Sequence, residues 1–369
     1  MTIDQHTMTA TIAGQPVTVL AGSTTLDRAW SPYAQGTLQI LAPDVPGLLD
    51  PRRRPQVIVH HRRRFSDSET VGYVSADHAG MTVGQVSTEY AGMTVDEMSA
   101  QYRTRWNGIG GPYGAGPGVT LVGWLSAARR SRTDPDVWEI EWNGDEIRAQ
   151  SSVALALTRP QIPTVRELVA RVLASAELGT LTPGPTGSES VLDDEGEYPE
   201  WTPGTNAWDY LEPIVTAHGY RLYADELAAW HLASDTTPTG ACTIGAEAVE
   251  VEDDWAVDNG RFFDTAVLVY QWQTAAGVTR TEIDSYRAGN VSAYVERIDG
   301  RLTKRGRARR IVERAMQRAL AQSWETVADY SIRPGQTATI TPDSTTGIVD
   351  AVTWQYPDAR STVTLIDIT

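Results

Sequence analysis

The chain has 369 residues, 41% of them hydrophobic, and a formal net charge of -16. This length suffices for two or three packed units, and the apolar content excludes wholesale disorder. The negative charge argues against a protein whose main work is holding nucleic-acid backbones, because that work needs a basic face. Cys242 is the only cysteine, which excludes an intrachain disulfide and a thiolate metal cluster.

Nothing in the sequence suggests insertion into a membrane. No run of 18 apolar residues occurs, and the first residues lack a basic region followed by an apolar one. We therefore expect no signal peptide and no membrane anchor, and a chain that is made in a cytoplasm.

The first 158 residues predict a small β-barrel domain. Short segments of alternating polarity are bounded by Gly, Pro or Asp, as is typical of strands. These segments lie at residues 9–22, 36–43, 55–63, 119–130 and 136–144. Five short strands at this spacing favour a barrel.

An insertion at about 76–118 interrupts these strands. It contains a tandem repeat, AGMTVGQVSTEY at 79–90 and AGMTVDEMSAQY at 91–102, with seven identical positions, followed by a glycine-rich loop. Thr82 and Thr94 are candidate helix caps, so we interpret the repeat as two short helical turns. A duplicated surface loop and a partner-binding insertion both remain open. Two copies of twelve residues are too little for a solenoid.

Residues 159–235 predict an αβ domain made of helices and a hairpin. TVRELVARVLASAELG carries apolar residues on one helix face, with Thr164 and Glu167 as a capping box and Gly179 as the stop. A polar spacer follows, and then NAWDYLEPIVTAHGYRLYADELAAWHL at 206–232 predicts a helix that ends at Gly219, before a tight hairpin. We expect Pro213 to bend this second helix.

Residues 236–369 predict a second small β-barrel domain. Short strand patterns fill most of this part and return at its end. Between them, a helix is predicted at about 302–325, with a basic outer face and inner residues Ile311, Val312, Ala315, Ala319 and Leu320. The fold class predicted from the whole chain is therefore α+β and mainly β: two small barrels, an αβ domain and a long C-terminal helix.

The sequence offers little sign of catalysis. The motifs HExxH, CxxC, GxSxG, GxxxxGK[ST] and GxGxxG are absent. His60 and His61 are neighbours on a predicted strand, so they would point to opposite faces rather than share a metal. Acidic pairs such as Glu139 with Glu141, together with 12 Trp, leave a glycan-degrading or carbohydrate-binding protein as an alternative. We otherwise expect no enzyme activity, no catalytic residue, no cofactor and no metal.

Two arginine clusters are candidate partner interfaces. The sequence PRRRPQVIVHHRRR places six arginines around one strand, and the predicted C-terminal helix places others on its outer face. A contact with a partner protein, simple solvation and nucleic-acid binding are all open, and we favour the protein contact. The candidate residues are Arg52, Arg53, Arg54, Arg62, Arg63, Arg64, Arg305, Arg309, Arg310 and Arg314.

The order of parts resembles the hub proteins of phage tail tips and baseplates, which include the tail-associated proteins of long-tailed phages and the hub proteins of contractile tails and injection systems. The resemblance rests on the helix at 164–179, the spacer, the helix and hairpin at 206–233, the helix RGRARRIVERAMQRAL and the closing strands from residue 337. It gives no account of the tandem repeat or of the glycine-rich loop.

The resemblance implies a structural protein of the virion tail, assembled in the cytoplasm of a bacterial host. In that family two barrels per chain and three chains form a ring that continues the tail tube, and the helix and hairpin lie beside the barrels. It implies a homotrimer, contacts with tube, tip or fibre and tape-measure proteins, and DNA only in transit. No lysin domain is expected, so enzyme activity is not implied, and the hub of a contractile injection system remains an alternative.

Overall fold

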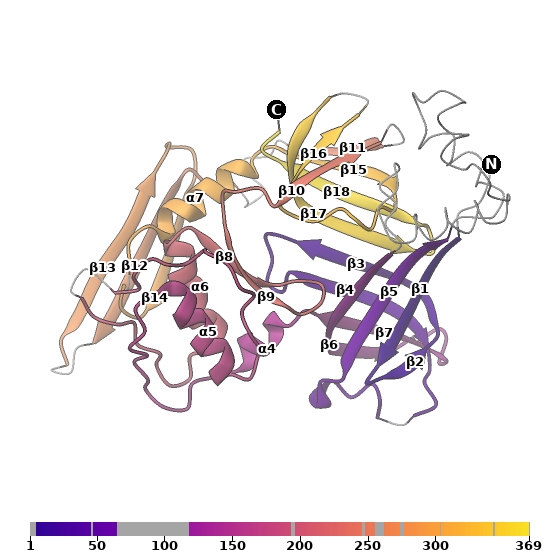
Figure 1. Ribbon diagram of the computed structural model, residues 1–369, viewed down its shortest axis with the longest axis horizontal. Helices are drawn as coiled ribbons and strands as arrows, with labels where there is room; N and C mark the ends of the chain where they lie inside the picture. Colours follow the sequence, from indigo (N-terminus) through magenta and orange to yellow (C-terminus); the bar gives the residue numbers. More distant parts are fainter. Residues whose placement is uncertain are drawn as a thin grey trace, which may run out of the picture.

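Most strands of the computed structural model belong to one large sheet (Figure 1). The structure describes residues 5–45, 47–64, 118–192, 196–245, 248–254, 262–273, 277–302, 304–341 and 344–368. The strand order is β11-β15-β18-β17-β3-β4-β7-β6-β5-β1-β2, and β10 and β16 join it through β17. The predicted insertion at 76–118, with its tandem repeat, lies outside the described residues except for Gly118.

Strands occupy all five segments predicted in the first 158 residues, and the first segment, 9–22, covers parts of three of them. They are β1 (Gln5–Ile12), β2 (Gln15–Val17), β3 (Val19–Asp27), β4 (Ala34–Leu41), β5 (Gln56–Arg64), β6 (Gly118–Arg130) and β7 (Val137–Asn143). Alternation explains them, because every second side chain points into the core. On β6, for example, Val119, Leu121 and Leu125 are buried. A short helical turn, η1 (Pro51–Arg53), precedes β5.

The C-terminal strands continue the same sheet. They are β10 (Gly240–Ile244), β11 (Val249–Asp254), β15 (Ala321–Val327), β16 (Gln336–Ile340), β17 (Thr346–Tyr356) and β18 (Arg360–Ile366). Strand β17 pairs with β3 from Ala351 opposite Asp27 to Tyr356 opposite Gly22. The two ends of the chain are therefore joined by backbone hydrogen bonds.

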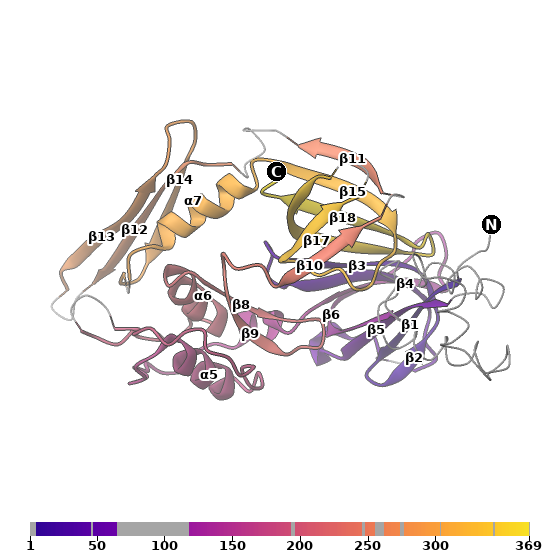
Figure 2. The same ribbon diagram turned by 45° about the horizontal axis from the view of Figure 1, so that its top comes forward.

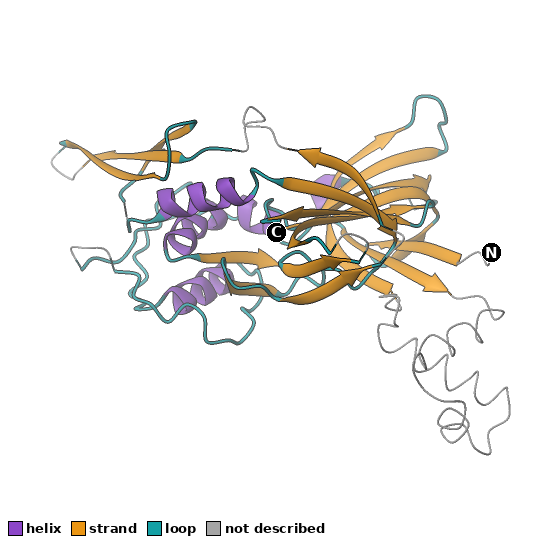
Figure 3. Ribbon diagram, turned by 90° about the horizontal axis from the view of Figure 1, so that it is seen from above, coloured by secondary structure: helices purple, strands orange, loops and turns teal. Residues whose placement is uncertain are grey.

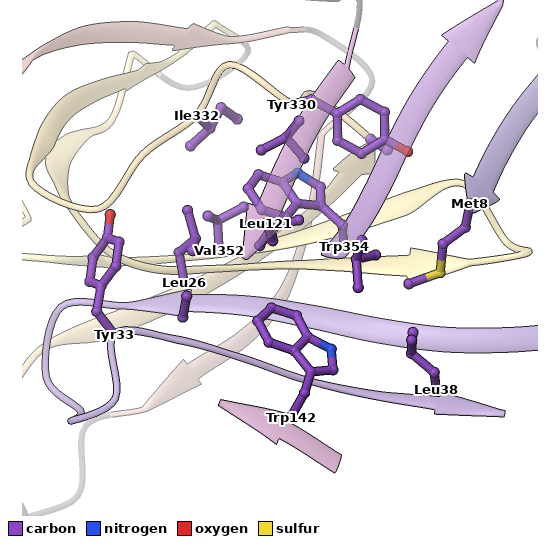
Figure 4. Packing of buried hydrophobic residues seen from close by; sticks show 14 of the residues in the cluster. Met8, Leu26, Tyr33, Leu38, Leu121, Trp142, Tyr330, Ile332, Val352 and Trp354 are labelled. Carbon is purple, nitrogen blue, oxygen red and sulfur yellow. The ribbon is translucent and has the colours of Figure 1, made fainter. Parts of the chain in front are cut away.

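This pairing joins the two predicted barrel domains in one sheet, and neither is confirmed as a closed barrel within the described residues. Thirteen of the described strands form one sheet, and its two halves share one hydrophobic core that includes Leu26, Trp142 and Trp354 (Figure 4). The physical reason is the length of β17, whose eleven residues have enough edge to pair with β16, β18 and β3. A strand pattern in the sequence does not reveal which partner each edge will take.

The helix and hairpin predicted at 159–235 are confirmed. Helix α5 (Val165–Ser175) begins at Thr164, whose Oγ1 accepts a hydrogen bond from the backbone N–H of Glu167. Helix α6 (Ala207–Ala217) contains Pro213 and is capped by Asn206. Strands β8 (Tyr220–Ala224) and β9 (Trp230–Ser234) form the hairpin, and α4 (Glu146–Ser151) leads into this unit. The unit has its own buried core.

Three strands predicted for the second barrel form a separate small sheet instead. They are β12 (Thr265–Gln273), β13 (Thr279–Arg287) and β14 (Ala293–Asp299), with β12 in the centre and β14 parallel to it. Helix α7 (Arg307–Gln317) packs on β12 and β13 and also contacts α6 (Figure 2). Seen from above, the helices lie between the small sheet and the large one (Figure 3).

The C-terminal helix is shorter than predicted. It ends at Gln317, not near 325, and residues 321–327 form strand β15. Val312 and Ala315 are buried as predicted, whereas Leu320 is exposed. In β15, Trp324 and Thr326 are buried. Ser323 and Glu325, each one position earlier, are only half-buried, so burial alternates with the two-residue period of a strand. Neither Gly nor Pro marks the change.

Candidate functional site: the junction and the outer surfaces

Asp145, at the start of α4, binds the large sheet to the hairpin. Its Oδ1 accepts a hydrogen bond from Nε1 of Trp124 on β6 at 2.8 Å, and its Oδ2 accepts one from Nε1 of Trp230 on β9 at 3.1 Å. Arg148 donates to Oδ1 at 3.0 Å. A buried carboxylate needs such donors, because burial removes its water. Asp145 thus fixes the angle between the sheet and the αβ unit.

Glu146 makes a second connection of the same kind. Its Oε1 accepts hydrogen bonds from the backbone nitrogens of Tyr33 at 3.1 Å and Ala224 at 2.9 Å, while its buried Oε2 has no hydrogen-bond partner. Burial is the largest cause that raises the pKa of Glu146 to about 7. The carboxyl group therefore changes its charge near neutral pH at a point where three parts of the chain meet.

Asp235, directly after β9, gathers three arginines from distant parts of the sequence. Arg314 of α7 donates to its Oδ2 at 2.7 Å, and nitrogens of Arg28 and Arg221 lie 3.7 and 3.9 Å from its Oδ1. The carboxyl group is buried, with 7% of its side chain exposed. This ion cluster connects the end of β3, the hairpin and α7.

Asp350 of β17 adds a fourth arginine to this junction. Arg318 donates from Nε to its Oδ2 at 3.2 Å, and the backbone N–H of Arg28 donates to its carbonyl oxygen. Burial, and next the charge of Asp350, raises the pKa of the nearby Asp27 to about 6. No sequence pattern predicts this cluster, because Arg28 and Asp350 lie more than 300 positions apart in the chain.

The first predicted arginine cluster lies on the outside of the large sheet. Arg52 and Arg53 of η1 are exposed, and Arg52 donates to Asp50 at 2.9 Å. Arg54 donates to Oγ of Ser151 at 2.7 Å. Arg62 is exposed on β5; the side chains of Arg63 and Arg64 lie outside the described part. The cluster is thus divided between η1 and the far end of β5.

The second predicted cluster divides into outward and inward arginines. Arg305 and Arg309 are exposed, and Arg309 pairs with Glu313. Arg310 is half-buried beside Gly219 and also pairs with Glu313. Arg314 points into the junction described above. The structure does not bring the two clusters together, since one lies on the large sheet and the other on α7 (Figure 1).

The geometry gives no support to a metal or sugar site within the described residues. His60 bonds to Thr120 and His61 to Thr24, on opposite faces of β5, as their adjacent positions predict. No group of three His, Cys, Asp or Glu side chains in the described part is placed to hold a metal ion. Most described Trp side chains are buried or half-buried, and among these residues Trp30 alone exposes more than half of its surface. A sugar platform would need exposed rings.

An apolar ridge lies on the surface between α4 and α5. It consists of Val153, Leu155 and Leu157, of which Leu155 is 93% exposed. Isolated bridges pair Val153 with Asn206 and Thr158 with Trp201, and the backbone bends at residues 155 and 156 between them. Single exposed apolar residues are common, but three within five positions favour a contact with another protein.

No helix among the described residues has the length and apolar character to cross a membrane. No family model matches the sequence, and no curated protein does so either.

Solved structures match over nearly the whole chain. A tail protein from Neisseria meningitidis MC58 aligns with a TM-score of 0.56 and 10% identity, over 98% of this chain and 96% of its own. The 43 kDa tail protein of prophage MuSo2 from Shewanella oneidensis aligns with a TM-score of 0.56 and 8% identity, over 98% and 100%. A type VI secretion component from E. coli, described as similar to tail proteins of bacteriophage T4, aligns with a TM-score of 0.52 and 11% identity, over 97% and 76%.

Identities this low establish the fold and not the activity. The matches cover both partners almost completely in two of these three cases, so the order and arrangement of the parts are shared, not just one sheet. The chain therefore has the same fold as these two phage-type tail proteins and the type VI secretion component.

Proposed function

We propose that this chain is a structural hub protein of a phage tail tip or baseplate, where three copies form a ring that continues the tail tube. The observation that carries the proposal is the alignment over 98% of the chain with two tail proteins. In this proposal the two halves of the large sheet are the barrel-like, tube-forming parts, and the helix and hairpin brace them.

The internal junction supports a structural role. Asp145, Glu146, Asp235 and Asp350 each join parts of the chain that are distant in sequence. Buried ion pairs and hydrogen bonds of this kind serve in this proposal to fix geometry more than to add stability. A ring subunit needs a fixed shape, because small errors in angle would prevent the ring from closing.

The outer surface supports assembly with other proteins. The ridge of Val153, Leu155 and Leu157 offers an apolar contact, and the exposed arginines Arg52, Arg53, Arg62, Arg305 and Arg309 offer charged ones. On a protein with a net charge of -16, such basic patches fit acidic surfaces of neighbouring subunits or of other tail proteins. We assign the arginines to those contacts and not to the DNA path, because a basic wall would hold phosphates.

The hub of a contractile injection system is the second candidate. The E. coli type VI secretion component favours it, because its fold matches 97% of this chain. The two candidates differ in the particle and not in the proposed role of the chain. A glycan-degrading or carbohydrate-binding role lacks a comparable observation, since the Trp side chains in the described part of the chain are buried or half-buried apart from Trp30.

The experiment that tests the proposal is a reconstruction of particles purified from the organism that encodes the chain. Labelling the chain with a small fused tag locates it in the particle. We expect three tags around the axis at the tip of the tail. Tags on the capsid, or particles without the chain, would contradict a tail hub.

A further inference from the structure

A cavity of about 50 Å³ lies where the end of β3, the hairpin, α7 and β17 meet. Its volume exceeds that of a single water in the liquid, about 30 Å³, so it has room for a small polyatomic ion. Its charged lining consists of Arg28, Arg221, Arg314, Arg318, Asp235 and Asp350.

The lining carries more positive than negative charge. Four guanidinium groups face two carboxylates, which leaves two positive charges uncompensated. Asp27, just outside the lining, reduces this excess to one when it is ionised. Burial, and next the charge of Arg28, lowers the pKa of Arg221 to about 10. Burial likewise lowers the pKa of Arg28. Both shifts arise mainly because burial disfavours the charged guanidinium groups.

Two of the arginines have donors to spare. Arg314 and Arg318 each bond a carboxylate through Nε, at 2.7 and 3.2 Å. Their Nη groups make no hydrogen bond within the described part of the chain, although both side chains line the cavity. A guanidinium group presents its donors in a plane that matches the oxygen pairs of a tetrahedral oxyanion.

Asp350 indicates which oxyanion fits. Its Oδ1 is buried and has no hydrogen-bond partner, and 10% of its side chain is exposed. An anion without a proton, such as sulfate, would be repelled by this oxygen. Phosphate near neutral pH keeps at least one proton, so its hydroxyl group can donate to Oδ1 while its other oxygens accept from the arginines.

We propose that this cavity binds a protonated tetrahedral oxyanion with the size and chemistry of inorganic phosphate. The bound ion would neutralise the arginine excess, satisfy Asp350 and connect the large sheet, the hairpin and α7. This inference is independent of the proposed tail role, because it concerns the stability of the junction in the isolated chain.

Titration calorimetry of the purified full-length protein tests the proposal directly. Phosphate, sulfate and chloride are compared at pH 7 and equal ionic strength, with melting temperatures measured in parallel. We expect one phosphate per chain, bound at least about tenfold more tightly than sulfate, and a rise in melting temperature with phosphate. Absence of saturable phosphate binding, or equal binding of sulfate, would overturn the proposal. If the cavity holds an adventitious ion only, phosphate and sulfate should bind equally.

Three variants separate the contributions of the lining. Arg318→Gln should weaken phosphate binding about tenfold or more, since it removes one charge-assisted donor set. Asp350→Asn should bring the phosphate and sulfate affinities close together, because an amide can also donate. Arg309→Gln, on the exposed side of the same helix, is the control and should bind as the wild type does. If a lining variant fails to fold, the preference of the wild-type protein for phosphate over sulfate still tests the proposed site. Unchanged binding in a folded Arg318→Gln protein would refute the site.

Discussion

Oε1 of Glu146 lies 2.9 Å from the backbone nitrogen of Ala224, on a strand 78 residues further along the chain. The same oxygen also accepts from Tyr33, so one carboxyl group connects the large sheet, α4 and the hairpin. Because the pKa of this buried group is raised to about 7, ionising it at neutral pH makes the folded state less stable.

The first prediction follows from that shift. The folded protein holds a proton on Glu146 up to about pH 7, whereas the unfolded chain loses it near pH 4.5, so this group makes the folded state less stable as pH rises between these values. The loss is about 3 kcal/mol in the free energy of unfolding. Glu146→Gln should remove this part of the pH dependence, which urea unfolding at several pH values measures.

His61 and Asp27 also titrate in this range, in opposite directions, since burial lowers the pKa of His61 to about 4 and raises that of Asp27 to about 6. The comparison is therefore made between wild type and variant at each pH. Glu146→Ala serves as the control. It leaves the two backbone donors unpaired and should destabilise by about 2 to 4 kcal/mol at every pH. Identical pH profiles of wild type and Glu146→Gln would exclude this account.

The second prediction contrasts two arginines of α7. Arg314→Glu should destabilise the protein by about 3 to 5 kcal/mol, because it places a negative charge beside the buried Asp235. Arg309→Glu should leave the free energy of unfolding nearly unchanged, since the Arg309 side chain is exposed, and should instead impair assembly into tails. Denaturant unfolding and particle yield check the two effects. Equal stability of both variants would show that the junction is not an ion-paired core.

The third prediction concerns the apolar ridge. Leu155→Ser should not lower the melting temperature, because the side chain is 93% exposed in the isolated chain. It should reduce incorporation into tails, since it removes apolar area from the proposed contact. Leu227→Ser, at another exposed leucine in the turn of the hairpin, is the matched control. Normal incorporation of the Leu155 variant would place the subunit contacts elsewhere.

The fourth prediction concerns the insertion. Strands β5 and β6 pair up to Arg62 opposite Gly118, so the two ends of the segment between them lie side by side. Replacing residues 65–117 by a short turn should therefore leave the rest folded, at modest entropic cost. Circular dichroism and melting of the shortened chain check this. We also predict that the insertion lies outside the tube channel. Loss of all soluble protein on shortening would count against this placement and against independent folding of the rest.

Local signals predicted much of the fold, and long-range pairing explains what they missed. The caps at Thr164 and Asn206 act between residues three apart, so their helices were predictable. The pairing of β3 with β17 joins residues more than 300 positions apart, and the sequence of neither strand predicts which strand it pairs with. The junction formed by Asp235 and Asp350 depends on that pairing, so it too was invisible in the sequence.

The candidate surface shows the same limit. Sequence patterns located the arginines but not their directions, and Arg314 proved to face inward while Arg309 faces outward. The ridge at Leu155 was missed because its flanking residues pattern like an ordinary core strand. The exposure of Leu155, 93%, depends on the three-dimensional arrangement and cannot be read from the sequence.

The most direct test of the central claim is a cryo-electron microscopy reconstruction of the intact particle without imposed symmetry at the tail tip. The account predicts three copies of the chain in a closed ring around the tail axis, with the exposed arginines against neighbouring proteins and away from the channel. A monomer in dilute solution would be compatible with this, because tail rings can require a template. A single copy on the axis, or both arginine clusters lining the channel, would contradict the account.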